Sequence, residues 1–379
     1  MSFTALGLTP ALLKILADQN YTLPTSIQQE AIPAILNKKD VLGISKTGSG
    51  KTASYVLPLL LNFKKVENIR NRHATILVLV PTRELAAQVL EVFQVFNPAM
   101  PHRVKCMAVY GGVSINPQMM GLQSVNILIA TPGRLLELID LNAVSLASIE
   151  TLVLDEADKM LNLGFKEEVN KIIALLPAKR QNLLFSATLN EDINLITQLL
   201  LNDPVVIKIG SPADATDTIT HTAYLVSAER KGPFLRYLLK QKDMRQVLIF
   251  ASSVHQADAI VDKLRKNEVD AKAIHSQKSQ GARTDALTKF KAGKLRVLVA
   301  TDLIARGIDI NFLPWVINYE LPRSPKDYIH RVGRTGRAEA AGEAISFISA
   351  DEEHHFKVIQ KKIELSIPLT DTADINLFQ

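Results

Sequence analysis

Short apolar segments alternate with longer amphipathic segments along most of the chain, and this alternation constrains the fold more than any other feature. Continuous apolar strands separated by helices are typical of a parallel sheet that helices cover on both faces. The pattern therefore predicts an α/β fold. We expect strands at residues 40–45, 75–80, 104–109, 126–130, 151–155 and 182–186, and again at 222–227, 247–251, 271–274, 296–301, 315–319 and 344–349.

The alternation pauses once, at residues 208–220, where small and polar residues accompany a glycine and a proline. Such a composition is typical of a linker. The sequence thus predicts two α/β domains of similar build. We expect the first domain at residues 1–208, the linker at 209–220, the second domain at 221–365 and a short tail at 366–379.

The composition is that of a globular protein, with 379 residues, 47% hydrophobic residues and one cysteine, Cys106. A lone thiol cannot form an internal disulfide, which fits a reducing compartment. The N-terminus lacks the pattern of a secretory signal, and the apolar runs are too short to span a bilayer. We therefore expect a cytoplasmic protein. The net charge of +6 permits a polyanionic partner without requiring one.

The sharpest local motif is a glycine-bearing turn between the strand expected at 40–45 and a helix expected at 53–61. Gly48 and Gly50 let backbone N–H groups approach phosphate oxygens, and the helix N-terminus adds its positive dipole end. Lys51 can reach the β- and γ-phosphates, and Thr52 can offer its hydroxyl to Mg²⁺. Ser45 stands where the strict pattern has Gly, and a small residue still fits. The alternative is an ordinary Gly/Ser turn, which the Lys-Thr pair disfavours.

An acidic pair, Asp155 and Glu156, follows the strand expected at 151–155. A nucleoside triphosphatase needs a carboxylate at the end of a neighbouring strand. Asp155 is suited to hold Mg²⁺, usually through water, and Glu156 to orient and deprotonate an attacking water. By itself the pair is more often a solvated helix N-terminus, but beside the phosphate loop the catalytic interpretation is favoured.

With the loop at Lys46–Thr52, the residues Asp155, Glu156, Ala157 and Asp158 resemble the DEAD-box ATP-dependent RNA helicase family of superfamily 2, in its minimal two-domain bacterial form. The resemblance covers nearly the whole chain. It implies two tandem RecA-like domains, RNA-stimulated hydrolysis of ATP to ADP and phosphate, and ATP and Mg²⁺ as cofactors. Residues implied in binding the nucleotide are Ser45, Lys46, Thr47, Gly48, Ser49, Gly50, Lys51 and Thr52, with Asp309 in the second domain at the ribose.

Residues 1–29 are similar to the family segment that selects adenine. The resemblance implies that Gln28 makes a two-point hydrogen bond to the adenine edge. Phe3 would stack on the base, and Tyr21 and Thr25 belong to the same segment. The family usually has Gly before the tyrosine, whereas this chain has Asn20, which tolerates a positive φ. A frayed terminus is the alternative for Phe3.

Several residues resemble the family's contacts to the RNA backbone, and the chemistry of Gly N–H groups, Thr hydroxyls and Arg suits phosphate and sugar oxygens. Each is also compatible with a turn or helix cap, and Arg83 and Arg134 with structural ion pairs. The implied contacts in the first domain are Pro81, Arg83, Gly111, Gly112, Thr131, Gly133 and Arg134, and those in the second are Arg283 and Thr301.

The remaining motifs would couple hydrolysis to RNA. Asp158, Ser186, Thr188 and His330 are implied in this coupling, although Thr188 also suits a helix cap. Arg334 and Arg337 are similar to the family's arginine fingers and are counted with Lys51, Asp155 and Glu156 as catalytic. A solvated basic loop is the alternative for the two arginines.

The expected partner is RNA, single-stranded or in short duplexes, bound through its backbone with low sequence specificity by a monomer. ATP and RNA would each favour closure of the two domains, and closure would open a short duplex locally. Two other functions remain open. One is an RNA-binding clamp that barely hydrolyses ATP, and the other is a DNA-translocating helicase of the same build.

Overall fold

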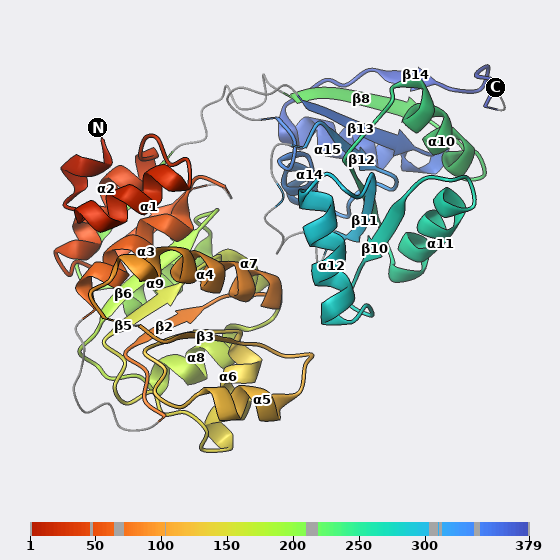
Figure 1. The fold of residues 1–379 in the computed structure, drawn as a ribbon. Coiled ribbons are helices and arrows are strands. Elements are labelled where there is room, and N and C mark those ends of the chain that lie inside the picture. Colours follow the sequence, from red (N-terminus) through yellow and green to blue (C-terminus); the bar gives the residue numbers. More distant parts are fainter. Residues whose placement is uncertain are drawn as a thin grey trace. The chain divides into compact units, whose positions relative to one another are not determined.

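A computed structural model describes residues 2–45, 48–63, 72–102, 104–209, 219–302, 310, 313–336 and 342–377. The chain forms two units, Met1–Ser211 and Pro212–Gln379, and the division between them falls inside the segment predicted as a linker. Each unit is built on one seven-stranded sheet in which every strand runs parallel to its neighbours (Figure 1).

The first sheet has the strand order β3-β4-β2-β5-β6-β1-β7. Its central strands are short and almost entirely apolar, so both faces need a cover of helices. The strands are β1 (Val41–Ile44), β2 (Ile76–Leu79), β3 (Cys106–Val109), β4 (Ile127–Ala130), β5 (Thr151–Leu154), β6 (Gln181–Ser186) and β7 (Val205–Lys208).

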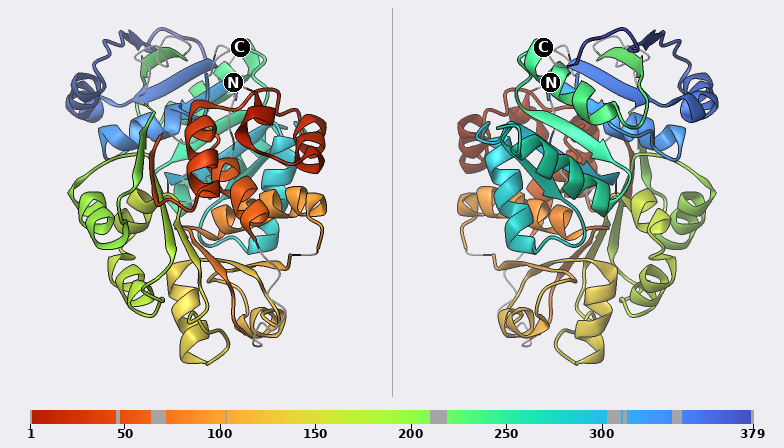
Figure 2. Two further views of the ribbon diagram at one scale, coloured as in Figure 1. Left: turned by 90° about the vertical axis from the view of Figure 1, so that its left-hand side faces the viewer. Right: turned by 90° about the vertical axis from the view of Figure 1, so that its right-hand side faces the viewer.

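Successive residues of each strand face opposite sides of the sheet, and two cores result. Val78 and Val153 pack with helices α1–α4 on one side, whereas Leu77 and Leu152 pack with α6–α9 on the other. Figure 2 shows these two helical layers from both sides. The helices are η1 (Phe3–Leu6), α1 (Pro10–Asp18), α2 (Ser26–Leu36), α3 (Lys51–Asn62), α4 (Arg83–Phe96), η2 (Asn97–Ala99), α5 (Ile115–Gly121), α6 (Pro132–Asp140), α7 (Ala157–Asn162), α8 (Lys166–Ala174) and α9 (Glu191–Leu200).

The second sheet has the order β10-β11-β9-β12-β13-β8-β14, which is the order of the first sheet with each strand seven places later in the chain. Helices α10 and α11 cover one face, and α12, α14 and α15 cover the other. The elements are β8 (Ile219–Leu225), α10 (Lys231–Gln241), β9 (Val247–Ala251), α11 (Val254–Arg265), β10 (Ala271–Ile274), α12 (Gln280–Lys291), β11 (Val297–Thr301), β12 (Trp315–Asn318), α14 (Pro325–Val332), β13 (Gly342–Ile348), η4 (Ala350–Glu352), α15 (Glu353–Ile363) and β14 (Leu369–Asp371).

Two strands lie outside the predicted set, and both are the last strand of their unit. β7 pairs with β1, and β14 pairs with β8. The segment 366–379, expected to be a short tail, therefore contributes an edge strand, and its Ile375 and Leu377 pack on the core. β8 also begins at Ile219, inside the segment expected to be a linker.

None of the helices in the described part of the chain combines the length and the apolar character needed to cross a membrane.

Candidate active site

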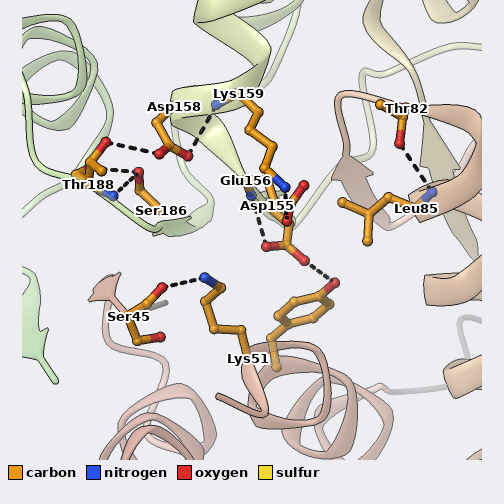
Figure 3. A network of polar contacts seen from close by, with 11 residues as sticks. Ser45, Lys51, Thr82, Leu85, Asp155, Glu156, Asp158, Lys159, Ser186 and Thr188 are labelled. Carbon is orange, nitrogen blue, oxygen red and sulfur yellow. Dashed lines mark hydrogen bonds and ion pairs between the residues drawn. The ribbon is translucent and has the colours of Figure 1, made fainter. Parts of the chain in front are cut away.

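The predicted site residues of the first unit follow the carboxyl ends of its parallel strands, which meet at one edge of the sheet. The register pairs Ile44 of β1 with Ser186 of β6, and the Ser45 N–H donates to the Ser186 carbonyl at 3.0 Å. β5 lies next to β6, and its end leads directly into Asp155. The phosphate loop, the acidic residues and Ser186 therefore converge, as Figure 3 shows.

The loop after β1 has the backbone that a phosphate cradle requires. Gly48 and Gly50 have φ of 78° and 92°, the left-handed region that favours glycine. Helix α3 begins at Lys51, whose buried ammonium donates to the Ser45 carbonyl at 2.5 Å, and burial lowers the pKa of Lys51. The Ser45 and Ser49 hydroxyls are hydrogen-bonded at 2.8 Å. The predicted Lys46 and Thr47 lie outside the described residues.

Gln28 holds the predicted adenine segment against this loop. Its side-chain oxygen accepts from the Thr25 N–H at 3.0 Å, and its amide donates to the Gly50 carbonyl at 3.2 Å. A Cβ at Gly50 would lie 2.6 Å from Gln28 Nε2 and 2.9 Å from Thr25 Oγ1. The glycine is thus required both for its φ and for this close approach.

The aromatic residues of the adenine segment are packed together. Phe3 is buried, and its ring lies edge-on to Tyr21 with centroids 6.4 Å apart. Tyr21 in turn contacts Phe96, 6.0 Å away. Asn20 has a φ of 59°, as its place in the turn requires. The structure therefore places Phe3 in an ordered 3-10 helix, and the described segment is not a frayed terminus.

Asp155 is held from both sides of its carboxylate. Oδ1 accepts from the Glu156 N–H at 2.9 Å, and Oδ2 accepts from the Tyr55 hydroxyl at 2.9 Å. Burial, reinforced by the charge of Glu156, raises the pKa of Asp155 to about 6, while Lys51 and the hydrogen bonds oppose the rise. A cation at this carboxylate would favour the ionised form.

Glu156 forms a buried ion pair with Lys159, with Nζ and Oε1 2.7 Å apart. Its backbone lies in the left-handed region, at a φ of 52°. A non-glycine residue rarely adopts this conformation, and such strain clusters at functional sites. The other oxygen, Oε2, is buried and has no hydrogen-bond partner among the described residues.

The predicted coupling residues of the first unit lie together. The Thr188 hydroxyl donates to Asp158 Oδ2 at 2.9 Å, and the Ser186 hydroxyl donates to the Thr188 carbonyl at 2.7 Å. Helix α9 has a different cap, since the Asn190 side chain accepts from the Ile193 N–H. Thr188 is therefore occupied by the acidic motif rather than by a helix cap.

The residues present fit a nucleotide with Mg²⁺. The left-handed glycines, the helix start and Lys51 make an anion site. The described residues contain no group of three or more His, Cys, Asp or Glu that could hold a metal. Mg²⁺ commonly takes one or two carboxylates together with substrate phosphates. Thr52, Asp155 and phosphate oxygens would form such a donor set, and the buried Glu156 Oε2 has no hydrogen-bond partner among the described residues.

Arg83 and Gly112, two of the predicted RNA contacts, lie close to each other. A Cβ at Gly112, whose φ is 78°, would lie 2.5 Å from the Arg83 guanidinium. Arg83 also pairs with Glu84 at 3.3 Å, and partial burial lowers its pKa. Thr82, between Pro81 and Arg83, caps α4 by accepting from the Leu85 N–H.

Arg134 is engaged in structural contacts. It pairs with Glu137 at 2.8 Å and donates to the Val113 carbonyl at 2.9 Å, so it fastens α6 to the loop after β3. Its side chain is buried, as is Thr131. A Cβ built at Gly111 or at Gly133 would have no other atom within 4 Å, so the space beside each of these residues is empty. An RNA contact by Arg134 stays a prediction.

In the second unit, Thr301 ends β11, and Arg283 lies buried in α12. His330 lies in α14, and Arg334 is buried just beyond it. The predicted Asp309 and Arg337 lie outside the described residues.

Three further residues belong to these motifs but were not predicted: Tyr55, Lys159 and Arg331. Arg331 is fully buried, makes a two-point pair with Asp302 at 2.6 and 2.7 Å, and lies over the Phe250 ring. Helical spacing was an available signal for Lys159, which lies three residues after Glu156.

The family models match both units. Residues 25–196 match the model of the DEAD/DEAH box helicase, and residues 230–339 match that of the helicase conserved C-terminal domain. The ATP-dependent RNA helicase DeaD of Buchnera aphidicola is 37% identical over 378 residues, which are 100% of this chain and 61% of that protein. The DEAD-box ATP-dependent RNA helicase CshA of Geobacillus kaustophilus is 36% identical over 97% of this chain and 79% of its own length.

Solved structures show the same fold. A DEAD box protein from the hyperthermophile Methanococcus jannaschii is 35% identical, with a TM-score of 0.55 over 98% of this chain and 99% of that one. Saccharomyces cerevisiae Dbp5 bound to RNA and ADP BeF3 is 28% identical, with a TM-score of 0.84 over 98% and 95%. The prediction of two RecA-like domains is thereby confirmed.

Several relatives are longer than this chain, which spans 59% of DEAD-box ATP-dependent RNA helicase 14 of Arabidopsis thaliana. Even so, three observations point to one family. Both family models match, the similarity covers nearly the whole chain, and the phosphate loop converges with Asp155, Glu156 and Asp158. The chain therefore belongs to the DEAD-box family of ATP-dependent RNA helicases.

Proposed function

We propose that this protein hydrolyses ATP to ADP and phosphate under stimulation by RNA, and that hydrolysis is coupled to domain closure and local opening of short RNA duplexes. The observation that carries the proposal is the buried Asp155–Glu156 pair at the end of β5, beside the phosphate loop that ends in Lys51. Relatives described as ATP-dependent RNA helicases along nearly this whole chain support it.

The first unit holds the groups for the chemical step. The N–H groups of Gly48–Gly50 and the start of α3 bind phosphate oxygens, and Lys51 neutralises their charge. Thr52 and Asp155 would hold Mg²⁺, which supplies further neutralisation of the phosphates. Glu156 takes the proton from the attacking water, and its unpartnered Oε2 faces no competing donor among the described residues.

The second unit supplies further groups for hydrolysis and for RNA binding. Arg334 and Arg337 reach the γ-phosphate as arginine fingers, which typically raise hydrolysis by ~10³–10⁵-fold. Asp309 binds the ribose, and His330 couples the two units. RNA is held through its backbone by Arg83, Gly112, Thr301 and Arg283, so sequence selectivity is low.

Adenine is selected by the segment at residues 1–29, which the Gln28 side chain hydrogen-bonds to the phosphate loop. In the structure both ends of the Gln28 amide are occupied, by the Thr25 N–H and the Gly50 carbonyl. The amide oxygen can accept a second hydrogen bond and the amide nitrogen carries a second hydrogen, so Gln28 can bind the adenine edge while it stays fastened to the loop. A base that fits would thus be sensed at Gly50, the residue of the phosphate loop that immediately precedes α3.

The experiment is steady-state ATP hydrolysis with no nucleic acid, with single-stranded RNA and with DNA of the same sequence. We expect strong stimulation by RNA, little by DNA, and loss of both basal and stimulated activity in Glu156→Gln. Equal rates with RNA and DNA would favour the DNA helicase. RNA binding without measurable hydrolysis would favour the clamp.

A further inference from the structure

Tyr55 places a hydroxyl against Asp155, one of the two residues expected to hold Mg²⁺. It lies in α3, one helical turn after Lys51, and is 0% exposed. Its hydroxyl donates to Asp155 Oδ2 at 2.9 Å. This contact joins helix α3 to the end of β5, between two residues that are 100 positions apart in the chain.

The ring alone does not account for a tyrosine here. It packs on Phe185 of β6, with centroids 5.4 Å apart, and a phenylalanine would make the same contact. A hydroxyl is costly to bury unless it has a partner. In this case the partner is Asp155, a residue of the candidate metal site, so core packing alone does not explain the hydroxyl.

Tyr55 also completes the orientation of the Asp155 carboxylate. The Glu156 N–H fixes Oδ1, and the Tyr55 hydroxyl fixes Oδ2. An ionised carboxylate has about four lone-pair sites, so two hydrogen bonds leave capacity on both oxygens for a cation or its waters. Removing one of the two donors would let the carboxylate rotate about its terminal bond.

We propose that Tyr55 is a positioning residue for Mg²⁺, whose hydroxyl holds the Asp155 carboxylate in the orientation that receives the cation. The inference rests on the proposed function, because it deepens the role of Asp155 as a residue that holds Mg²⁺. Groups that orient metal ligands typically contribute ~10–100-fold in metal affinity or activity.

The test compares wild type with Tyr55→Phe, which removes only the hydroxyl. Binding of a fluorescent ADP is measured with saturating MgCl₂ and with EDTA. We expect equal affinities in EDTA. The gain in affinity on adding Mg²⁺ should be about tenfold smaller in Tyr55→Phe, and the half-saturating Mg²⁺ concentration about tenfold higher.

Ser54→Ala is the matched control. Ser54 is the neighbouring residue of α3, is 0% exposed, and donates to the Lys51 carbonyl at 2.6 Å, so its loss also removes one buried hydroxyl from the helix. It does not contact Asp155 in the described structure. We expect its Mg²⁺ dependence to match wild type.

A Tyr55→Phe protein that keeps the wild-type Mg²⁺ dependence would overturn the inference, whatever its thermal stability. An equal loss of affinity in EDTA and in Mg²⁺ would also overturn it, because that pattern indicates altered packing. Failure of the proposed function would be visible in wild type itself, as an absence of RNA-stimulated hydrolysis. The two failures are therefore distinguishable.

Discussion

At the scale of single residues, the pair formed by Glu156 and Lys159 combines the proposed catalytic role of Glu156 with deep burial. The two side chains are 9% and 5% exposed. A buried ion pair adds little net stability compared with an apolar pair, but removing one partner leaves an uncompensated charge in the interior. Lys159 is therefore needed to keep a carboxylate in this position before any substrate arrives.

We expect Lys159→Met to lower the free energy of unfolding of the first unit by about 3 kcal/mol, since methionine fills similar space without the charge. Urea unfolding followed by far-UV circular dichroism measures the change. Fluorescence of Trp315, the single tryptophan, reports the second unit separately and should not move.

Lys166→Met provides the control for a surface pair. Lys166 contacts Asp192 at 2.9 Å, with side chains 53% and 50% exposed. Exposed pairs contribute about 0–1 kcal/mol, so this variant should unfold almost as wild type does. If both lysine variants lost the same stability, burial would not be the reason that the Glu156–Lys159 pair is sensitive to substitution.

Single residues also show where sequence reasoning ends. The motifs identify Lys51, Asp155 and Glu156 by type and spacing, because their chemistry depends on local turns. The partners Tyr55 and Arg331 depend on contacts made only after folding, such as the reach of Tyr55 across to Asp155. Gln28 was predicted because its segment resembles the adenine-selecting segment of the family, but its bond to Gly50 requires the segment to fold back onto the loop.

At the scale of elements, a capping box fixes the start of the 3-10 helix η4, which leads directly into α15. Glu352 Oε2 accepts from the Ser349 N–H at 3.0 Å, from the Ser349 hydroxyl at 2.6 Å and from Lys231 at 3.0 Å. Burial alone would raise the pKa of Glu352, but the hydrogen bonds from Ser349 and Lys231 outweigh it and lower the pKa below its ordinary value.

A carboxyl with a lowered pKa contributes stability that is present above its unfolded pKa and is lost as the pH falls through the folded one. We expect wild type to lose more stability than Glu352→Gln between about pH 5 and about pH 3. Urea unfolding followed by Trp315 fluorescence is the measurement, since Trp315 lies in the same unit. Parallel pH profiles of the two proteins would show that Glu352 does not titrate in this way.

The missed strands β7 and β14 have a common physical cause. Central strands are apolar throughout and are recognised by that pattern. β7 and β14 are short edge strands with mostly exposed or half-exposed side chains, and β14 reads Leu-Thr-Asp. What holds β14 is non-local: Arg230 donates to the carbonyls of Thr372 and Ile375 at 2.8 and 2.9 Å.

At the scale of the whole molecule, the proposed closure makes RNA and nucleotide binding reciprocal. The factor by which a non-hydrolysable ATP analogue tightens RNA must equal the factor by which RNA tightens the analogue. We expect a common factor of ~5–150. Fluorescence anisotropy with labelled RNA, and then with labelled nucleotide, gives the two values.

ADP serves as the comparison, because it lacks the γ-phosphate that Arg334 and Arg337 are proposed to contact. It should tighten RNA much less than the ATP analogue does. RNA affinity that is the same with the analogue, with ADP and without nucleotide would argue that the two sites are independent.

The fold class was predictable because alternating apolar and amphipathic segments leave few architectures for a parallel sheet. The strand order was not predictable, because tertiary packing decides which strands become neighbours in the sheet. That order is the same in both units, including the edge strands that the sequence pattern did not indicate.

The place of β7 has a mechanical consequence. β7 ends at Lys208, just before the segment that leads to the second unit, and its register pairs Lys208 with Ile44, the last residue of β1. The Ile209 N–H extends the ladder by donating to the Ile44 carbonyl at 3.0 Å. A pull directed along β7 would load this ladder in shear, with several hydrogen bonds resisting together. The pull would thus be transmitted first to the strand that leads into the phosphate loop.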